Sequence, residues 1–147
     1  YLQDSRLRLI ELNLDSEEKL KQQLEGLAFD YVVHAAGVTK CADRRDFRRI
    51  NTEGTIHLVS ALRALQMPLK RFVYLSSLSV YGAIHEQQPY EDIREDDTPH
   101  PNTEYGRSKL EAERWLDSQA GPTFPYVVLR STSATWCRPY SLLWIMG

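Results

Sequence analysis

The run Asp30–Gly37 (Asp-Tyr-Val-Val-His-Ala-Ala-Gly) limits the possible folds most, because its apolar residues do not alternate with polar ones. A strand of this kind is expected to be buried on both faces, which is typical of a parallel sheet covered by helices on each side. Arg71–Ser77 and Tyr126–Arg130 show the same pattern, and the partly alternating run Arg6–Leu12 predicts a strand ahead of them. We therefore expect four strands.

Helix signals fall between each pair of predicted strands. Asp15 as an N-cap, with Glu18 three residues later, predicts a first helix. A second helix is predicted from Asn51 until Pro68 stops it, and a third over Ser108–Leu116. Their predicted buried positions are Leu20, Leu24 and Leu27; Leu58, Val59, Leu62 and Leu65; and Leu110, Ala112, Trp115 and Leu116.

The resulting order, with strands separated by helices of crossover length, predicts a doubly wound α/β layer with a parallel sheet. Cys41–Arg49 is predicted as a loop or as the exposed start of a helix. Residues 82–104 contain three prolines among many acids and are expected to form a long surface loop, which is often a functional feature. The segment Ser131–Gly147 has no clear period, and the sequence gives it no assignment.

Length and composition exclude several classes of protein. The 147 residues fit one domain, and a net charge of −2 with no like-charge block argues against nucleic-acid or membrane-surface binding. No apolar run approaches the roughly 18 residues that span a bilayer, and no signal peptide is visible. Cys41 and Cys137 lie outside C-x-x-C spacing and no histidine pair has metal spacing, so we expect a reduced, cytoplasmic protein without a metal site.

Ligands of an open parallel sheet bind beyond the carboxyl ends of its strands. The residues expected there are Asn13–Leu14, Ala35–Gly37, Ser76–Ser77 and the segment around Arg130. Most of these are small or hydrogen-bonding, which would let a flat ligand approach the backbone. The alternative is that Ala35–Gly37 only allows a tight turn and close helix packing.

Tyr105 lies four residues before Lys109, which places both side chains on one face of the third predicted helix. A neighbouring cation lowers the pKa of a phenol, so this pair could act as a general acid and base. Ser77, at the end of a strand, could donate to the same substrate oxygen. The alternatives are a surface helix that carries Tyr and Lys, and a serine that caps its strand. Serine hydrolase chemistry is disfavoured because no G-x-S-x-G surrounds Ser77, and His34 is expected to be a hydrogen-bonded core residue.

Several short motifs occur in one order along the chain and together carry a family resemblance. They are Asn13–Leu14, His34–Gly37, Asn51–Thr55, Tyr74–Gly82 and Tyr105–Lys109. As a set, they resemble the extended short-chain dehydrogenase/reductases, the NAD-dependent epimerase/dehydratase family of nucleotide-sugar enzymes. The resemblance implies a Rossmann-like fold, NAD or NADP as cofactor and a small-molecule substrate such as a nucleotide sugar, and it leaves a homodimer open.

The resemblance also implies roles for individual residues. Ser77 would polarise the substrate oxygen, Tyr105 would be the general acid/base, and Lys109 would lower its pKa and bind the nicotinamide ribose. The cofactor-binding residues that the resemblance implies are Asn13, Leu14, Ala35, Ala36, Gly37, Thr39, Asn51, Tyr105 and Lys109. Two positions depart from the family pattern: Asn13 replaces an aspartate, and Thr52 replaces a valine.

Two parts of the family pattern have no counterpart in the sequence. The G-x-x-G-x-x-G turn and the first strands, which hold the pyrophosphate, would precede Tyr1. Residues 1–130 are therefore expected to be a partial, truncated NAD(P)-binding domain, and residues 131–147 an atypical tail without a substrate domain. On this interpretation the chain alone is inactive. A carbonyl or sterol-type reductase of the same family, or a non-catalytic dinucleotide-sensing or scaffold protein, stays open as an alternative.

Overall fold

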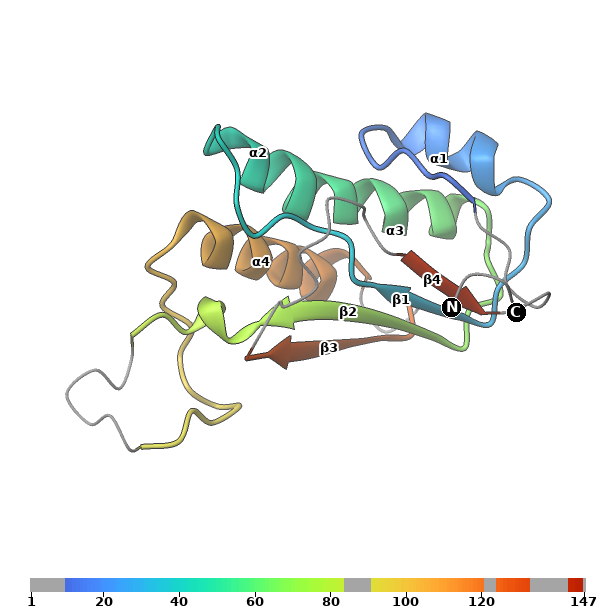
Figure 1. The fold of residues 1–147 in the computed structure, drawn as a ribbon. Coiled ribbons are helices and arrows are strands. Elements are labelled where there is room, and N and C mark those ends of the chain that lie inside the picture. The colour runs from blue at the N-terminus through green and yellow to red at the C-terminus, as the bar shows by residue number, and fades with distance from the viewer. Residues whose placement is uncertain (1–9, 84–90, 121–123, 133–142, 147) are drawn as a thin grey trace, which may run out of the picture.

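The computed structural model describes residues 10–83, 91–120, 124–132 and 143–146. Helices and strands alternate along most of this length (Figure 1). In chain order the elements are α1 (Glu17–Leu24), β1 (Tyr31–His34), α2 (Arg45–Phe47), η1 (Arg48–Glu53), α3 (Gly54–Ala64), β2 (Arg71–Ser77), η2 (Leu78–Val80), α4 (Glu104–Trp115), η3 (Leu116–Ala120), β3 (Tyr126–Ser131) and β4 (Leu143–Met146).

The sheet has four strands in the order β3-β2-β1-β4. β1 is parallel to β2 and β2 is parallel to β3, so the predicted α/β class with parallel strands is confirmed. The last strand differs, because Leu143–Met146 runs antiparallel to β1 and forms one edge of the sheet. No structure was predicted for this part of the tail. Ser131 also belongs to the sheet, as the last residue of β3.

The strand predicted at Arg6–Leu12 is not present in the described part of that segment. Residues 10–12 are irregular, and residues 6–9 lie outside the described residues. The side chain of Gln23 occupies the backbone groups that a neighbouring strand would use. Its amide donates to the carbonyl of Glu11 at 3.0 Å and its oxygen accepts from the N–H of Asn13 at 3.0 Å. The backbone at Glu11 and Asn13 is therefore tied to α1.

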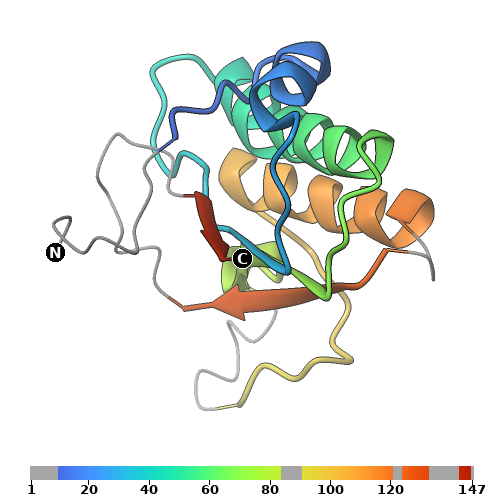
Figure 2. The same cartoon turned by 90° about the vertical axis from the view of Figure 1, so that its right-hand side faces the viewer.

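The longer helices α1, α3 and α4 lie on the same side of the sheet (Figures 1 and 2). Side chains that point toward them are buried, as Val32 and His34 are at 0% exposed. Side chains on the other face remain open, and Tyr31 is 42% and Leu129 51% exposed. The prediction that the strands are buried on both faces is therefore wrong, because no described helix covers the second face.

Leucines at one-turn spacing build the core between the helices and the sheet, as predicted. Leu20, Leu24, Leu58, Val59, Leu62, Leu110, Ala112 and Leu116 are buried, whereas Leu27, Leu65 and Trp115 are partly buried at its border. Ser16, and not the predicted Asp15, caps α1, because its hydroxyl accepts from the N–H of Lys19. No described helix is long and apolar enough to cross a bilayer.

The segment Cys41–Arg49 was predicted either as a loop or as the exposed start of a helix. A helical run extends from Arg45 to Ala64. Residues 41–44 are irregular, and Arg45 begins the helix, so the second half of the segment is a helix start. The run widens into a π-helical turn at Arg48–Glu53, which buries Asn51 and Thr52. Such turns are rare and are often found at functional sites. Here the turn directs Asn51 toward the loop that follows β1.

Candidate active site

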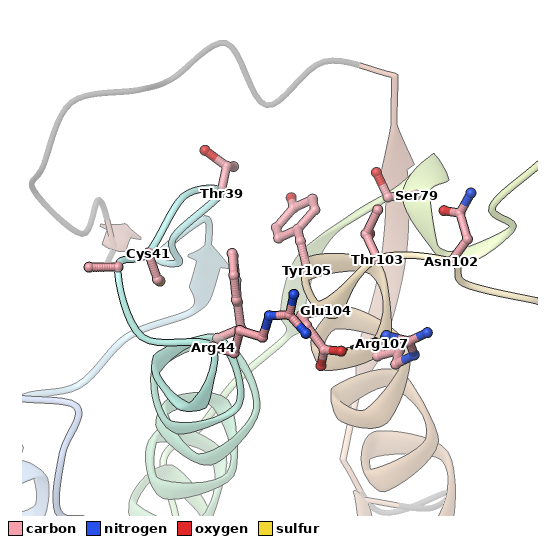
Figure 3. A pocket seen from close by; sticks show the side chains of 11 residues that line it. Thr39, Cys41, Arg44, Ser79, Asn102, Thr103, Glu104, Tyr105 and Arg107 are labelled. Carbon is pink, nitrogen blue, oxygen red and sulfur yellow. Dashed lines mark hydrogen bonds and ion pairs between the residues drawn. The ribbon is translucent and has the colours of Figure 1, made fainter.

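A pocket of about 590 Å³ opens near the carboxyl ends of β1 and β2 (Figure 3). This volume falls within the range of about 300–1,000 Å³ that is common for small-molecule sites. Its walls come from the loop after β1, from α2, from η2 and from the start of α4. The lining residues are Thr39, Cys41, Ala42, Arg44, Phe47, Ser79, Asn102, Thr103, Glu104, Tyr105 and Arg107. Thr39 and Tyr105 are the predicted site residues among them.

Tyr105 reaches the pocket because the first turn of α4 packs directly on η2. Thr103 caps the helix by accepting from the N–H of Gly106 at 3.0 Å. A Cβ at Gly106 would lie only 2.2 Å from the carbonyl oxygen of Ser79, so this close approach requires glycine. The contact places Tyr105 beside Ser79, and the centroid of the Phe47 ring lies 6.4 Å from that of the phenol ring.

Lys109, one helical turn after Tyr105, is buried and only 4% exposed. Its ammonium lies 4.5 Å from the ring centroid of Tyr74, in the geometry of a cation–π contact. Burial lowers the pKa of Lys109 to about 8, although the carboxylate of Glu113 acts in the opposite direction. A surface helix with an exposed lysine, the structural alternative for this motif, is therefore wrong for Lys109.

Ser77 ends β2 and is 5% exposed. Its hydroxyl accepts from the N–H of Ser79 at 3.1 Å and donates to the hydroxyl of Ser79 at 3.1 Å. Ser77 thus caps η2, the turn that follows the strand. Ser79 lines the pocket, so the two hydroxyls form a short chain that ends at the cavity wall.

Asn51 joins the loop after β1 to the helix that carries Tyr105. Its side chain accepts from the N–H of Val38 at 2.7 Å and donates to the carbonyl of Val38 and to the hydroxyl of Ser108, both at 3.0 Å. Ser108 in turn donates to the carbonyl of Tyr105 at 2.8 Å. A Cβ at Gly37 would lie 2.8 Å from the Asn51 oxygen, so glycine is needed for this contact.

His34 is a buried, hydrogen-bonded core residue, as predicted. The hydroxyl of Thr55 donates to the carbonyl of Asn51 at 2.7 Å, so it accepts from Nε2 of His34 at 2.9 Å. This fixes the tautomer and leaves Nδ1 without a hydrogen-bond partner among the described residues. Burial, and then the charge of Lys109, lower the pKa of His34 to about 3, so the ring is neutral.

The other predicted cofactor residues divide into two groups. Ala35, Ala36 and Gly37 follow β1 directly, and Ala36 is 2% exposed. Asn13 and Leu14 do not line the pocket. The Asn13 side chain accepts from the N–H of Asp15 at 2.8 Å, and the Leu14 carbonyl accepts from Nδ1 of His57 at 2.8 Å, so both positions are tied to the starts of α1 and α3.

Several lining residues were not identified from the sequence. Ser79 could have been found, because it lies two positions after Ser77 in the same motif. Arg44 and Phe47 come from a segment without period, and no local signal marked them.

Within residues 10–83, 91–120, 124–132 and 143–146, no three His, Cys, Asp or Glu side chains form a group that could hold a metal ion.

Comparison with known protein families identifies the chain. The NAD dependent epimerase/dehydratase family matches residues 2–135, which is most of the sequence. The chain belongs to this family. The match includes the sheet residues β1 to β3 and every predicted site residue.

Relatives within the family act on nucleotide sugars, according to their names. The chain is 41% identical over 88 residues to GDP-6-deoxy-D-mannose reductase of Pseudomonas aeruginosa, covering 57% of this chain and 28% of that protein. It is 33% identical over 118 residues to UDP-glucose 4-epimerase of Yersinia pestis, covering 76% of this chain and 33% of that protein. The chain thus spans about a third of the length of these relatives.

Solved structures of the family share the fold. RMD from Pseudomonas aeruginosa, complexed with NADPH, has a TM-score of 0.67 at 30% identity and covers 82% of this chain and 41% of that chain. UDP-glucuronic acid 4-epimerase from Bacillus cereus, in complex with NAD, matches with a TM-score of 0.61 at 26% identity. The matched region covers 82% of this chain and 34% of the epimerase chain. The Rossmann-like fold expected from the resemblance is confirmed.

Proposed function

We propose that the chain carries the proton-transfer part of an NAD(P)-dependent enzyme that oxidises a carbinol carbon, or reduces a carbonyl carbon, of a nucleotide sugar. One observation carries this proposal: Tyr105 lines a pocket of suitable size, and the buried ammonium of Lys109 follows one turn later on the same helix. The names of the relatives, which are a GDP-sugar reductase and UDP-sugar epimerases, support the substrate class. The neighbours with bound NADPH or NAD support the cofactor.

The end of β1 fits a dinucleotide. Small residues follow the strand, and the ammonium of Lys109 lies 3.7 Å from the position that a Cβ at Gly37 would take. A flat ligand could therefore approach the backbone there and still meet a cation. We assign Ala35, Ala36, Gly37, Thr39, Asn51, Tyr105 and Lys109 to the cofactor site, with Asn13 and Leu14 at its adenine end. The nicotinamide would supply the hydride acceptor or donor.

The protein's own residues would then move the proton. When the carbinol is oxidised, its hydroxyl proton passes to Tyr105, and in the reverse direction Tyr105 returns it to the carbonyl oxygen. The ammonium of Lys109 favours the phenolate form, because an adjacent cation lowers the pKa of a phenol. Ser77, through the hydroxyl chain with Ser79, supplies a donor to the same substrate oxygen.

Replacement of Tyr105 by phenylalanine tests the proposal. Tyr105→Phe keeps the ring that packs near Phe47 and removes the hydroxyl. In a version extended to the relatives' length, turnover of UDP- and GDP-sugars should fall by about 10²–10⁴-fold. Sugar products are measured by chromatography, and net reduction is measured by the absorbance of NADH or NADPH. Tyr31→Phe is the matched control, because Tyr31 is 42% exposed on the opposite face of the sheet. Activity of Tyr105→Phe within about twofold of wild type would refute the assignment.

The length of the relatives suggests a second part of the proposal. Because the chain covers about a third of them, we expect these 147 residues alone to show no turnover and a version extended to the relatives' length to be active. Calorimetric titration of both versions with NAD and NADP, alongside the turnover assay, separates the possibilities. Turnover by the 147 residues would contradict this part. Dinucleotide binding by the longer version without turnover would favour a sensor instead of an enzyme.

A further inference from the structure

Among the described residues, Arg44 has no ion-pair partner, whereas the other arginines of the segment Arg44–Arg49 are neutralised. Three neighbouring arginines form ion pairs with carboxylates, at distances between 2.7 and 3.1 Å: Arg45 with Asp43, Arg48 with Glu111, and Arg49 with Asp15 and Asp46. In the part of the chain that the structure describes, no carboxylate lies within ion-pair distance of Arg44. Arg44 is exposed to solvent, and it differs from the three neighbouring arginines in having no carboxylate partner among the described residues.

Arg44 also lines the pocket that contains Tyr105. Figure 3 shows its side chain reaching from the start of α2 toward the first turn of α4. The pocket has two other charged residues, Glu104 and Arg107, and these pair with each other at 2.6 Å. The charge that the pocket leaves uncompensated is therefore the positive charge of Arg44.

We infer that Arg44 binds an oxyanion, a phosphate or a carboxylate, which the substrate carries near its reacting carbon. A guanidinium presents a planar set of donors that matches two oxygens of either group. This inference rests on the proposed function only for the identity of Tyr105 as the reacting end of the pocket. It narrows the substrate class, because a neutral sterol or simple carbonyl compound would leave the cation unpaired.

Binding of small anions tests this inference without any turnover. We would titrate the 147-residue chain at about 0.15 M salt with inorganic pyrophosphate, with glucuronate and with glucose, and follow backbone amide shifts by NMR. Both anions should shift amides in the segment Thr39–Phe47, and glucose should not. Arg44→Gln should raise the dissociation constant of the bound anion by about tenfold or more, as expected for a charge-assisted hydrogen bond.

Arg45→Gln is the matched control, because it removes the same charge from the adjacent position and its guanidinium already pairs with Asp43. It should change anion affinity by less than about twofold. The anion that binds more tightly identifies a phosphate or a sugar carboxylate as the source.

Equal losses in the two arginine variants, or no anion binding by the wild-type chain, would overturn the role of Arg44. Neither result bears on the acid/base role of Tyr105, which the turnover of Tyr105→Phe tests separately.

Discussion

The buried ammonium of Lys109 should make the protein less stable at neutral pH than a variant without it. Its pKa is about 8 in the folded chain, against 10.5 for an ordinary lysine. A difference of 2.5 pH units corresponds to about 3 kcal/mol. Below pH 8 both the folded and the unfolded chain hold the proton, so the folded state bears this whole cost. The contribution of Glu113 is already contained in the pKa.

The sign of the pH dependence follows from proton binding. Between pH 8 and 10.5 the unfolded chain keeps the Lys109 proton and the folded chain releases it, so stability rises with pH. Lys109→Met removes the charge and keeps an unbranched side chain beside Tyr74. At pH 7 the free energy of unfolding of the variant should therefore exceed that of the wild type by about 3 kcal/mol, in addition to any constant packing difference. This excess should vanish near pH 11.

Urea unfolding of both proteins at steps from pH 6 to 11 measures the prediction. Other titrating groups are common to the two proteins and cancel in the difference. Lys70→Met serves as the control, because Lys70 is 63% exposed in its ion pair with Asp30 and should change stability by less than about 1 kcal/mol at every pH. A difference between Lys109→Met and wild type that stays constant from pH 7 to 11 would refute the reasoning.

Two further substitutions test the core around the site. Burial holds the pKa of His34 near 3, below the ordinary 6.5, so the folded chain loses stability as pH falls from 6.5 toward 3. His34→Gln keeps a donor for Thr55 and should remove about 4–5 kcal/mol of this loss. Acid unfolding followed by circular dichroism measures it, and an unchanged acid midpoint would contradict the prediction. Gly106→Ala should lower the free energy of unfolding in urea by about 2–3 kcal/mol, because the new Cβ meets the Ser79 carbonyl oxygen at 2.2 Å. In the control Gly54→Ala, the new Cβ meets only Leu14, at 3.4 Å, and stability should change by less than about 1 kcal/mol. Equal effects of the two substitutions would count against the close approach.

Local patterns were sufficient to predict the parallel strands but not their surroundings. Arg71–Ser77 was predicted at its observed bounds, because a continuous apolar run between turn signals is a property of the segment itself. Which face of a strand is covered depends on distant parts of the chain. The open side of Tyr31 and Leu129 could therefore not be read from the sequence.

The two misjudged segments show the same limit at the edges of the sheet. A strand needs a partner, and at Glu11 and Asn13 the side chain of Gln23 supplies hydrogen bonds that a neighbouring strand would have supplied. Conversely, Leu143–Met146 is too short for its period to distinguish a strand, and it becomes one only through pairing with β1, more than a hundred residues away.

The candidate site also combines features that local spacing predicts with contacts that it does not predict. Helical spacing alone predicts that Tyr105 and Lys109 share a face, and the structure places both on α4. The burial of Lys109 against Tyr74 depends on how α4 packs over β2, and Arg44 enters the pocket only because the loop after β1 returns beside α4. These contacts join segments far apart in the chain, and no local period marks them.

The position of Lys109 is also the strongest argument that this region is functional. A lysine on an ordinary exposed helix costs nothing to keep charged, whereas Lys109 is 4% exposed and bears a cost of about 3 kcal/mol. Methionine or leucine would fill the same space without that cost. A residue that lowers stability while its spacing and neighbours fit an acid/base pair is the kind of local inconsistency that accompanies function. The surrounding hydrogen bonds, from Asn51 through Ser108 to the backbone of Tyr105, would then serve to hold the pair in place.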